Sequence, residues 1–161
     1  MGDATIGIRQ GTVEDHAQAR GVIAETFAFH QREAPAFFRE TDDPPPTRMA
    51  IEELLRDGEG AWFLAEQEGS VVGFVTVRLR QPSREPSLVP EVRAIVDSLG
   101  ILRAWRRRGI GRRLMEAAEA WARQRGVQRV MLNVWEFNEG ASGLYETLGY
   151  TTFNRNLWKA L

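Results

Sequence analysis

The chain contains no cysteine among its 161 residues. Without thiols it can form no disulfide bond and no thiolate metal site, and it has no cysteine to act as a nucleophile. Its two histidines, His16 and His30, lie far apart in the sequence. Two isolated imidazoles do not give the ligand spacing of a zinc site. We therefore predict no metal site.

The chain also lacks an excess of either charge and any long apolar segment. Lys and Arg total 21 against 22 Asp and Glu, which gives a formal net charge of -1. This balance offers no overall reason to expect a nucleic-acid or membrane partner. No apolar run approaches the length of a membrane span, and residues 1–10 lack the pattern of a secretion signal. We therefore expect a cytoplasmic protein that binds neither nucleic acid nor membrane.

Length and patterning predict one mixed α/β domain over residues 1–161. The predicted strands are 5–11, two within 61–81 around a turn at 68–69, 91–102, 127–135, and one or two within 150–161. The predicted helices are 12–30, a short one within 49–58, 111–124 and 138–149. Thr12 and Asp15 stand where a capping box begins the first helix.

Positive charge is concentrated in one segment, 106–121, which reads RRRGIGRRLMEAAEAW. A helix N-terminus has unpaired N–H groups and a positive dipole end, and arginine side chains match phosphate as forked donors. Gly109 can adopt backbone angles closed to other residues, and Gly111 allows a ligand to approach the main chain closely. The segment therefore predicts a pyrophosphate clamped at a helix start.

Other interpretations of this segment fit less well. The dinucleotide pattern G-x-G-x-x-G fails because Leu114 occupies the third glycine position, and no Gly-Lys-Ser/Thr of a P-loop is present. A nucleic-acid patch lacks a platform of stacking aromatic residues. A solvated basic turn is the plain alternative, and the two glycines after a predicted strand argue against it.

Two motifs together resemble a known family. Arg106-x-x-Gly109-x-Gly111 resembles the Gln/Arg-x-x-Gly-x-Gly/Ala signature of the GNAT superfamily of N-acetyltransferases. Residues 138–150, NEGASGLYETLGY, are similar to its Asn-x-x-Ala-x-x-x-Tyr-x-x-x-Gly segment. The resemblance implies a single domain with a mixed, mostly antiparallel central sheet flanked by helices. It also implies that acetyl-CoA binds in a cleft between two splayed parallel strands.

The resemblance assigns cofactor contacts residue by residue. It places Leu99, Gly100 and Ile101 along the pantetheine, with one of their N–H groups against the acetyl carbonyl to stabilise an oxyanion. Asn138 matches the family asparagine that contacts the cofactor, and it is an equally good helix N-cap. The pyrophosphate would lie on the segment formed by Arg106, Arg107, Arg108, Gly109, Ile110, Gly111 and Arg112.

The resemblance also suggests catalytic roles. Tyr145 matches the family tyrosine near the cofactor sulfur, where it would protonate the leaving thiolate; packing in an amphipathic helix is the alternative. Some relatives use a glutamate as general base at the position that Asn133 occupies here, and asparagine cannot take a proton. Asp97, expected on the same face of its strand as Leu99, and Glu136 are equal candidates for the base. An unassisted amine is the third option.

The expected activity is direct transfer of acetyl from acetyl-CoA to a primary amine of a small molecule. The alternatives are a protein N-terminus or lysine as acceptor, a larger acyl group, a CoA-binding sensor without turnover, and a nucleic-acid role for the arginines. A homodimer is a possible assembly, because dimers are common in the family. Acidic residues hint at a cationic amine, and they are Glu33, Glu40, Asp42 and Asp43. His16 is expected on the surface, and His30 could border the acceptor pocket.

Overall fold

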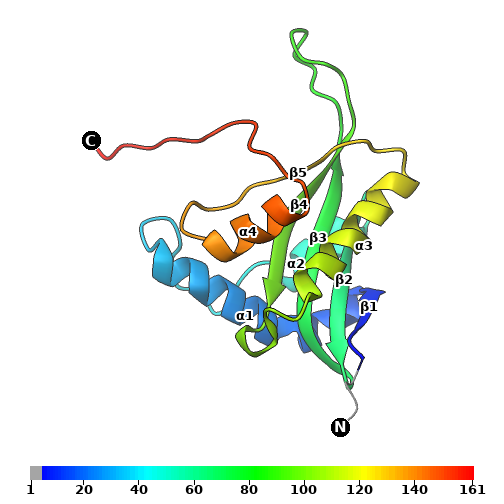
Figure 1. Ribbon diagram of the computed structural model, residues 1–161, viewed down its shortest axis with the longest axis vertical. Helices are drawn as coiled ribbons and strands as arrows, with labels where there is room; N and C mark the ends of the chain where they lie inside the picture. The colour runs from blue at the N-terminus through cyan, green and yellow to red at the C-terminus, as the bar shows by residue number, and fades with distance from the viewer. Residues whose placement is uncertain (1–4) are drawn as a thin grey trace.

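A five-stranded sheet forms the centre of the protein, which is described by a computed structural model over residues 5–161 (Figure 1). The strands are β1 Gly7–Gln10, β2 Gly60–Gln67, β3 Ser70–Arg80, β4 Arg93–Ile101 and β5 Val130–Leu132. They lie in chain order, and all neighbours are antiparallel except the parallel pair β4–β5. This confirms the predicted mixed, mostly antiparallel sheet. The first four positions of the predicted domain 1–161 lie outside the described residues.

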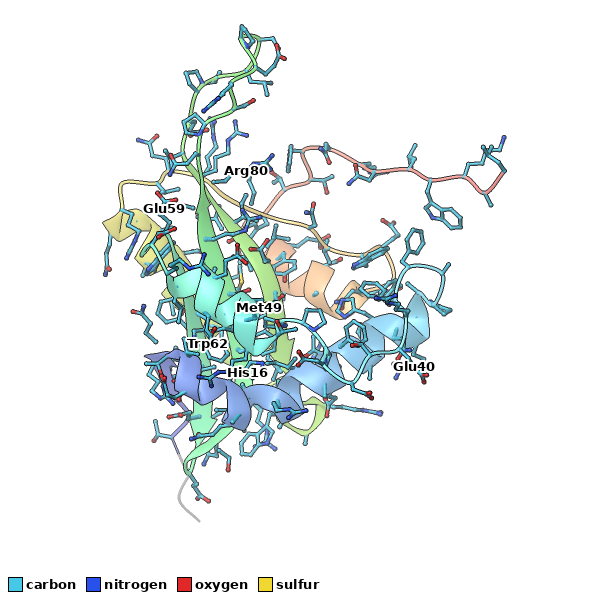
Figure 2. The ribbon with its side chains drawn as sticks, turned by 180° about the vertical axis from the view of Figure 1, so that it is seen from behind. His16, Glu40, Met49, Glu59, Trp62 and Arg80 are labelled. Atoms are coloured by element: carbon cyan, nitrogen blue, oxygen red, sulfur yellow. The ribbon has the colours of Figure 1, made fainter. Side chains whose placement is uncertain are left out.

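Helices cover both faces of the sheet. The helices are α1 His16–Glu33, α2 Arg48–Leu55, α3 Ile110–Gln124 and α4 Glu139–Thr147. α1 and α2 lie on the face seen in Figure 2, where they bury Trp62, Leu64 and Phe74 of the sheet. α3 packs on the opposite face through an apolar stripe that includes Leu114 and Trp121.

A β-bulge interrupts β4 at Asp97. Thr76 of β3 pairs with Ser98, whereas the next residue, Val77, pairs with Val96, so Asp97 is the extra residue. The bulge places Asp97 beside Ser98 on the α2 face, where both line a pocket, while Leu99 packs with the α3 cluster. The expectation that Asp97 and Leu99 share a face is therefore wrong, because the bulge breaks the alternation of side chains.

The parallel strands β4 and β5 part after three residue pairs. Pairing runs from Ala94 with Val130 to Val96 with Leu132, and β4 then continues alone to Ile101. β5 is much shorter than the predicted strand 127–135 because residues 133–138 turn away into a loop. Beyond Val96, the edge of β4 that faces β5 has no strand partner among residues 5–161. This is the splayed pair that the family resemblance implies.

Two further expectations differ from the structure. Residues 150–161 form no strand, and residues 151–161 are exposed throughout. His16 is 7% exposed, not a surface residue, and its Nε2 lies 3.0 Å from the carbonyl oxygen of Pro46. The capping box of Thr12 and Asp15 is present, although it begins a short 3-10 turn, Val13–Asp15, that leads into α1.

Candidate functional site

The loop between β4 and α3 leaves a helix start without partners. Arg107 and Gly109 adopt left-handed backbone angles, with φ of 64° and 75°. α3 has no side-chain cap and no acidic residue in its first turn. The N–H groups of Ile110, Gly111 and Arg112 make no hydrogen bond to any residue in the described range. Such a group of free N–H donors at a positive helix end favours an anion.

The arginines around this helix start differ in how they are held. Arg106 donates from Nε to the carbonyl oxygen of Ile101 at 3.0 Å, and its guanidinium lies 3.8 Å from the carboxylate of Glu25. Arg108 stacks over the ring of Trp105 at 4.7 Å. Arg107, Arg108 and Arg112 have no carboxylate partner within residues 5–161, so their positive charge remains available.

Gly100 and Gly111 both make room for neighbouring protein side chains. A Cβ on Gly100 would collide with the side chains of Thr26 and Phe74, so this glycine lets α1 lie against β4. A Cβ on Gly111 would lie 2.8 Å from Leu144, so that glycine brings α4 close to α3. Gly109 has open space around its Cα, and its role is the left-handed turn, as predicted.

The cofactor strand residues lie where the strands part. Leu99, Gly100 and Ile101 pair with β3 on one side only, and the side chains of Leu99 and Ile101 pack with the α3 cluster. On the β5 side this stretch has no strand partner among residues 5–161, and of its main-chain groups there the carbonyl oxygen of Ile101 is taken by Nε of Arg106.

α4 brings Asn138 and Tyr145 to the α3 side of this region. The Oδ1 atom of Asn138 accepts a hydrogen bond from the N–H of Ala141 at 3.2 Å, so the residue is an N-cap, and its side-chain amide N–H groups remain free. Tyr145 is 9% exposed, lies edge-on to Tyr150, and has no hydrogen bond to its hydroxyl from the described residues. Burial raises the pKa of Tyr145 to about 12.

A pocket of about 490 Å³ opens at the bulge of β4, between α2 and the sheet. We call it the acidic pocket because its wall carries four carboxylates and one guanidinium: Glu53, Asp57, Glu59, Asp97 and Arg78. Thr76, which is 4% exposed and has no side-chain hydrogen bond within residues 5–161, also lines it. Of the acidic residues singled out from the sequence, Asp97 lines this pocket, whereas Glu33, Glu40, Asp42 and Asp43 do not. Its residues come from separate elements, so no sequence motif marks it.

An aromatic cluster, also not predicted, joins the end of α1 to the loop after β5. Its members are Phe29, His30, Phe37, Phe38, Trp135 and Phe137. The Nδ1 atom of His30 donates a hydrogen bond to the carbonyl oxygen of Thr26 at 2.9 Å, which fixes its ring inside the cluster. Glu136, the second candidate base, is exposed between Trp135 and Phe137. The structure does not bring Glu136 to the acidic pocket that contains Asp97.

No helix in residues 5–161 is long and apolar enough to span a membrane. The same residues contain no group of three or more acidic or histidine side chains placed to hold a metal ion.

Comparison with known proteins identifies the family. Residues 23–150 match the Acetyltransferase (GNAT) family. The uncharacterized N-acetyltransferase YdgE of Bacillus subtilis is 25% identical over 93% of this chain and 94% of its own. A mutant of the BH1408 protein from Bacillus halodurans has a similar structure, with a TM-score of 0.89, 20% identity, and coverage of 96% and 99% of the two chains. The aminoglycoside N-acetyltransferase AAC(6')-Iy in complex with CoA has a TM-score of 0.75 at 18% identity, over 98% and 95% of the chains. The chain is a member of the GNAT family of acetyltransferases.

Proposed function

We propose that the protein transfers an acetyl group from acetyl-CoA directly to a primary amine of a small, cationic molecule. One observation carries this proposal: the unpartnered start of α3 directly follows the strand whose edge is exposed by the parting of β4 and β5. The free strand edge and the anion site follow one another along the chain. This order suits a ligand that has an amide-bearing arm at one end and a pyrophosphate at the other.

In this arrangement the pyrophosphate lies on the N–H groups of Ile110, Gly111 and Arg112. Arg107 and Arg108 add charge that no carboxylate in the described range neutralises. The pantetheine follows β4 backwards from Ile101, pairing with its free edge. The thioester then lies close to the bulge, because that is where β4 meets β5 again.

The acceptor amine enters through the acidic pocket, since that pocket opens at the same bulge. Its volume of about 490 Å³ suits a small molecule better than a folded protein surface. Its excess of carboxylates favours a ligand with more than one ammonium group. Thr76 offers to a polar group of the acceptor a hydroxyl that has no partner among residues 5–161. The acidic pocket thus supports the choice of a cationic amine over a neutral one.

The amine must lose a proton before or as it attacks the thioester carbon. Asp97 is the better placed candidate base because it lies at the bulge, whereas Glu136 is exposed on the loop after β5. Both carboxylate oxygens of Asp97 accept hydrogen bonds from Arg78, at 2.7 and 3.2 Å. We therefore propose that Asp97 receives the proton through a bridging water.

The C–S bond then breaks, and the electron pair leaves with sulfur as a thiolate. A main-chain N–H of Leu99, Gly100 or Ile101 stabilises the oxyanion of the preceding tetrahedral intermediate. The pKa of Tyr145, about 12, exceeds that of an ordinary thiol, about 8.5, so full proton transfer would cost about 5 kcal/mol. Tyr145 therefore acts first as a hydrogen-bond donor to the thiolate, and solvent supplies the final proton.

The test is the melting temperature of the protein with acetyl-CoA, with ATP, and with a short DNA duplex. A ligand at a hundredfold excess over its dissociation constant stabilises by about 2.7 kcal/mol, which is several degrees for a domain of this size. A shift with acetyl-CoA alone is expected, followed by thiol release with a panel of di- and polyamines. A shift with DNA only would overturn the proposal and reassign the arginines.

If the protein binds acetyl-CoA but acetylates no small amine, two other functions remain. Transfer to a peptide N-terminus or lysine would replace the small acceptor by a protein. No transfer to either would make the domain a CoA sensor. A larger acyl-CoA that outcompetes acetyl-CoA would change the donor.

A further inference from the structure

Lysine is nearly absent from this chain. Lys and Arg total 21 residues, and Lys159 is the only lysine among them. The guanidinium group of arginine stays protonated in proteins, whereas the amine of lysine can lose its proton and is a target of acetylation. Lys159 is therefore the one side chain in the sequence that could attack a thioester as an amine.

Lys159 lies in an exposed segment, residues 151–161, which we call the tail. Figure 1 shows the tail leaving α4 and running past the sheet. The tail contains no helix or strand, and its residues form no hydrogen bond with residues 5–150. Lys159 itself has no carboxylate partner within the described chain. The tail can therefore move against the domain without breaking a hydrogen bond.

One aromatic contact holds the tail against the α1 side of the domain. The ring of Trp158, the residue before Lys159, lies edge-on to Phe37 at 5.2 Å between centroids. Phe37 belongs to the connection between α1 and α2, which also contributes Pro45 and Pro46 to the wall of the acidic pocket. The carboxylates of that pocket attract an ammonium group. Trp158 thus keeps Lys159 on the segment that leads to the pocket proposed for the acceptor amine.

The tail begins beside the residue proposed to meet the cofactor sulfur. Tyr150, which precedes the tail, donates from its main-chain N–H to the carbonyl oxygen of Tyr145 at 3.0 Å. Lys159 follows nine residues later, and nine extended residues reach about 30 Å. A short flexible tether keeps an attached group at a roughly millimolar effective concentration. Lys159 is therefore tethered within reach of the thioester bound by its own copy.

We propose that Lys159 is a modification site, acetylated at Nζ by its own copy of the protein. The reaction uses the same donor and the same site as the acetyl transfer described above, so it rests on the proposed function. The Nζ atom attacks the carbonyl carbon of the thioester, a C–N bond forms, and the C–S bond breaks with the electron pair leaving on sulfur. Of the two protons that the ammonium loses, one is balanced by protonation of the thiolate and one is released to solvent. The acetylated side chain is neutral.

The first test is incubation of the purified full chain with acetyl-CoA, followed by peptide mass spectrometry. We expect one acetyl group on Lys159, formed with a first-order rate constant that does not depend on protein concentration. The chain unfolded in urea measures the uncatalysed background, which the folded protein should exceed by at least about tenfold. Equal rates in the folded and unfolded chains would overturn the proposal. A rate constant that rises with protein concentration would also overturn it, because the amine would then come from a second copy.

Variants of the tail separate its docking from catalysis. Trp158→Ala removes the contact with Phe37, so acetylation of Lys159 should slow by about three- to tenfold, the effect of losing one aromatic pair. Thiol release with a small amine should not change, because Trp158 is not one of the proposed catalytic groups. Leu157→Ala is the matched control, since Leu157 is 92% exposed and should alter neither rate. A Lys159 rate that Trp158→Ala leaves unchanged would contradict the docking of the tail.

A parallel assay of thiol release with small amines distinguishes this proposal from the proposed function. Lys159→Arg should acetylate small amines at the full rate and carry no acetyl group at this position. Turnover of a small amine by a wild-type chain whose Lys159 stays unmodified, or is acetylated only at its N-terminal amine, would overturn the modification site alone. Failure to acetylate any amine, with no shift in melting temperature on adding acetyl-CoA, would overturn both.

Discussion

Arg78 binds Asp97 through two hydrogen bonds, from Nε and Nη2 to the two carboxylate oxygens, at the bulge of β4. The pair is partly exposed, with side chains 45% and 39% accessible, so it adds at most about 1 kcal/mol to folding stability. Both residues line the acidic pocket. In the proposed mechanism Arg78 holds the Asp97 carboxylate where the acceptor amine would meet the thioester.

Replacing Asp97 by asparagine should therefore reduce catalysis much more than stability. We expect kcat/KM for the best amine to fall by about 100-fold or more, the usual contribution of a general base. The melting temperature should change little because the pair is exposed. Steady-state kinetics by thiol release measures this. Glu136→Gln is the matched control, and a larger loss in Glu136→Gln than in Asp97→Asn would assign the base to the loop after β5.

The acidic pocket predicts charge-dependent substrate binding. The double variant Glu53→Gln/Asp57→Asn removes two carboxylates from the pocket wall. KM for a diamine or polyamine should rise by about tenfold, while kcat should change little, because the second ammonium lies away from the reacting carbon. Asp42→Asn/Asp43→Asn serves as the control, since these exposed residues do not line the pocket. An equal rise in KM in both double variants would move the acceptor to the loop after α1.

Because Gly109 forms a left-handed turn, replacing it by alanine should specifically weaken binding of the cofactor. An alanine there is strained at φ +75°, although it meets no neighbouring atom. Relief of that strain reorients the N–H groups at the start of α3, so the Kd for acetyl-CoA should rise, with a stability cost of about 1 kcal/mol. Gly143→Ala is the control, because it also lies in open space and has ordinary helical angles. It should stabilise the fold by about 0.5–1 kcal/mol without weakening binding. Isothermal titration and thermal melts distinguish the two variants.

The hydroxyl of Tyr145 is predicted to matter for turnover and not for folding. It has no protein partner in the described residues, so Tyr145→Phe should leave the melting temperature nearly unchanged. Loss of a hydrogen bond to a charged sulfur costs about 1.5–3 kcal/mol, so kcat should fall by about 10- to 100-fold. The pKa of about 12 keeps the phenol protonated, so the ratio of wild-type to variant kcat should stay constant from pH 7 to about 10. A ratio that declines as pH passes 8 would show that the hydroxyl ionises far more readily than its burial implies.

Much of the fold was predictable because local sequence motifs agree with the pattern of buried apolar residues. The sequence motif around Gly109 predicts the anion site because the chemistry depends on neighbouring residues and on backbone angles. α3 follows from apolar patterning, whereas the parallel pair of strands was expected from the family resemblance. The bulge at Asp97 was not predictable, because one extra residue leaves the apolar pattern almost unchanged while moving a side chain to the other face.

The acidic pocket and the aromatic cluster were missed for a second reason. Their members are far apart in sequence and meet only when α1, α2 and the loop after β5 take their places. One or two strands were predicted within 150–161 because these residues have strand propensity, but a strand also needs a neighbour to pair with. In this structure these residues pair with no strand of residues 5–161.

The hydrogen bonds at the start of α1 predict how the free energy of unfolding depends on pH. The Asp15 carboxylate accepts two hydrogen bonds from Arg9 and one from the N–H of Thr12, and Arg9 also pairs with Glu66. Arg9 is the largest cause that holds the pKa of Asp15 well below its usual range. A depressed pKa in the folded state means that the ionised form stabilises the fold above the unfolded pKa of about 3.9, and that this stability is lost as pH falls toward the folded pKa.

Asp15→Asn should therefore cost about 1–2 kcal/mol at pH 7, from a lost cap and a partly exposed ion pair. The difference in free energy of unfolding between wild type and variant should stay constant down to about pH 5. It should shrink below about pH 4, where the carboxylate of the unfolded chain takes up a proton while that of the folded chain is still ionised, and it should close as pH falls toward the folded pKa. Urea unfolding at several pH values measures it. Glu14→Gln is the neighbouring control, because Glu14 is exposed and should show no gap at any pH. A gap for Asp15→Asn that persists unchanged at pH 3 would mean that shape, not charge, holds the start of α1.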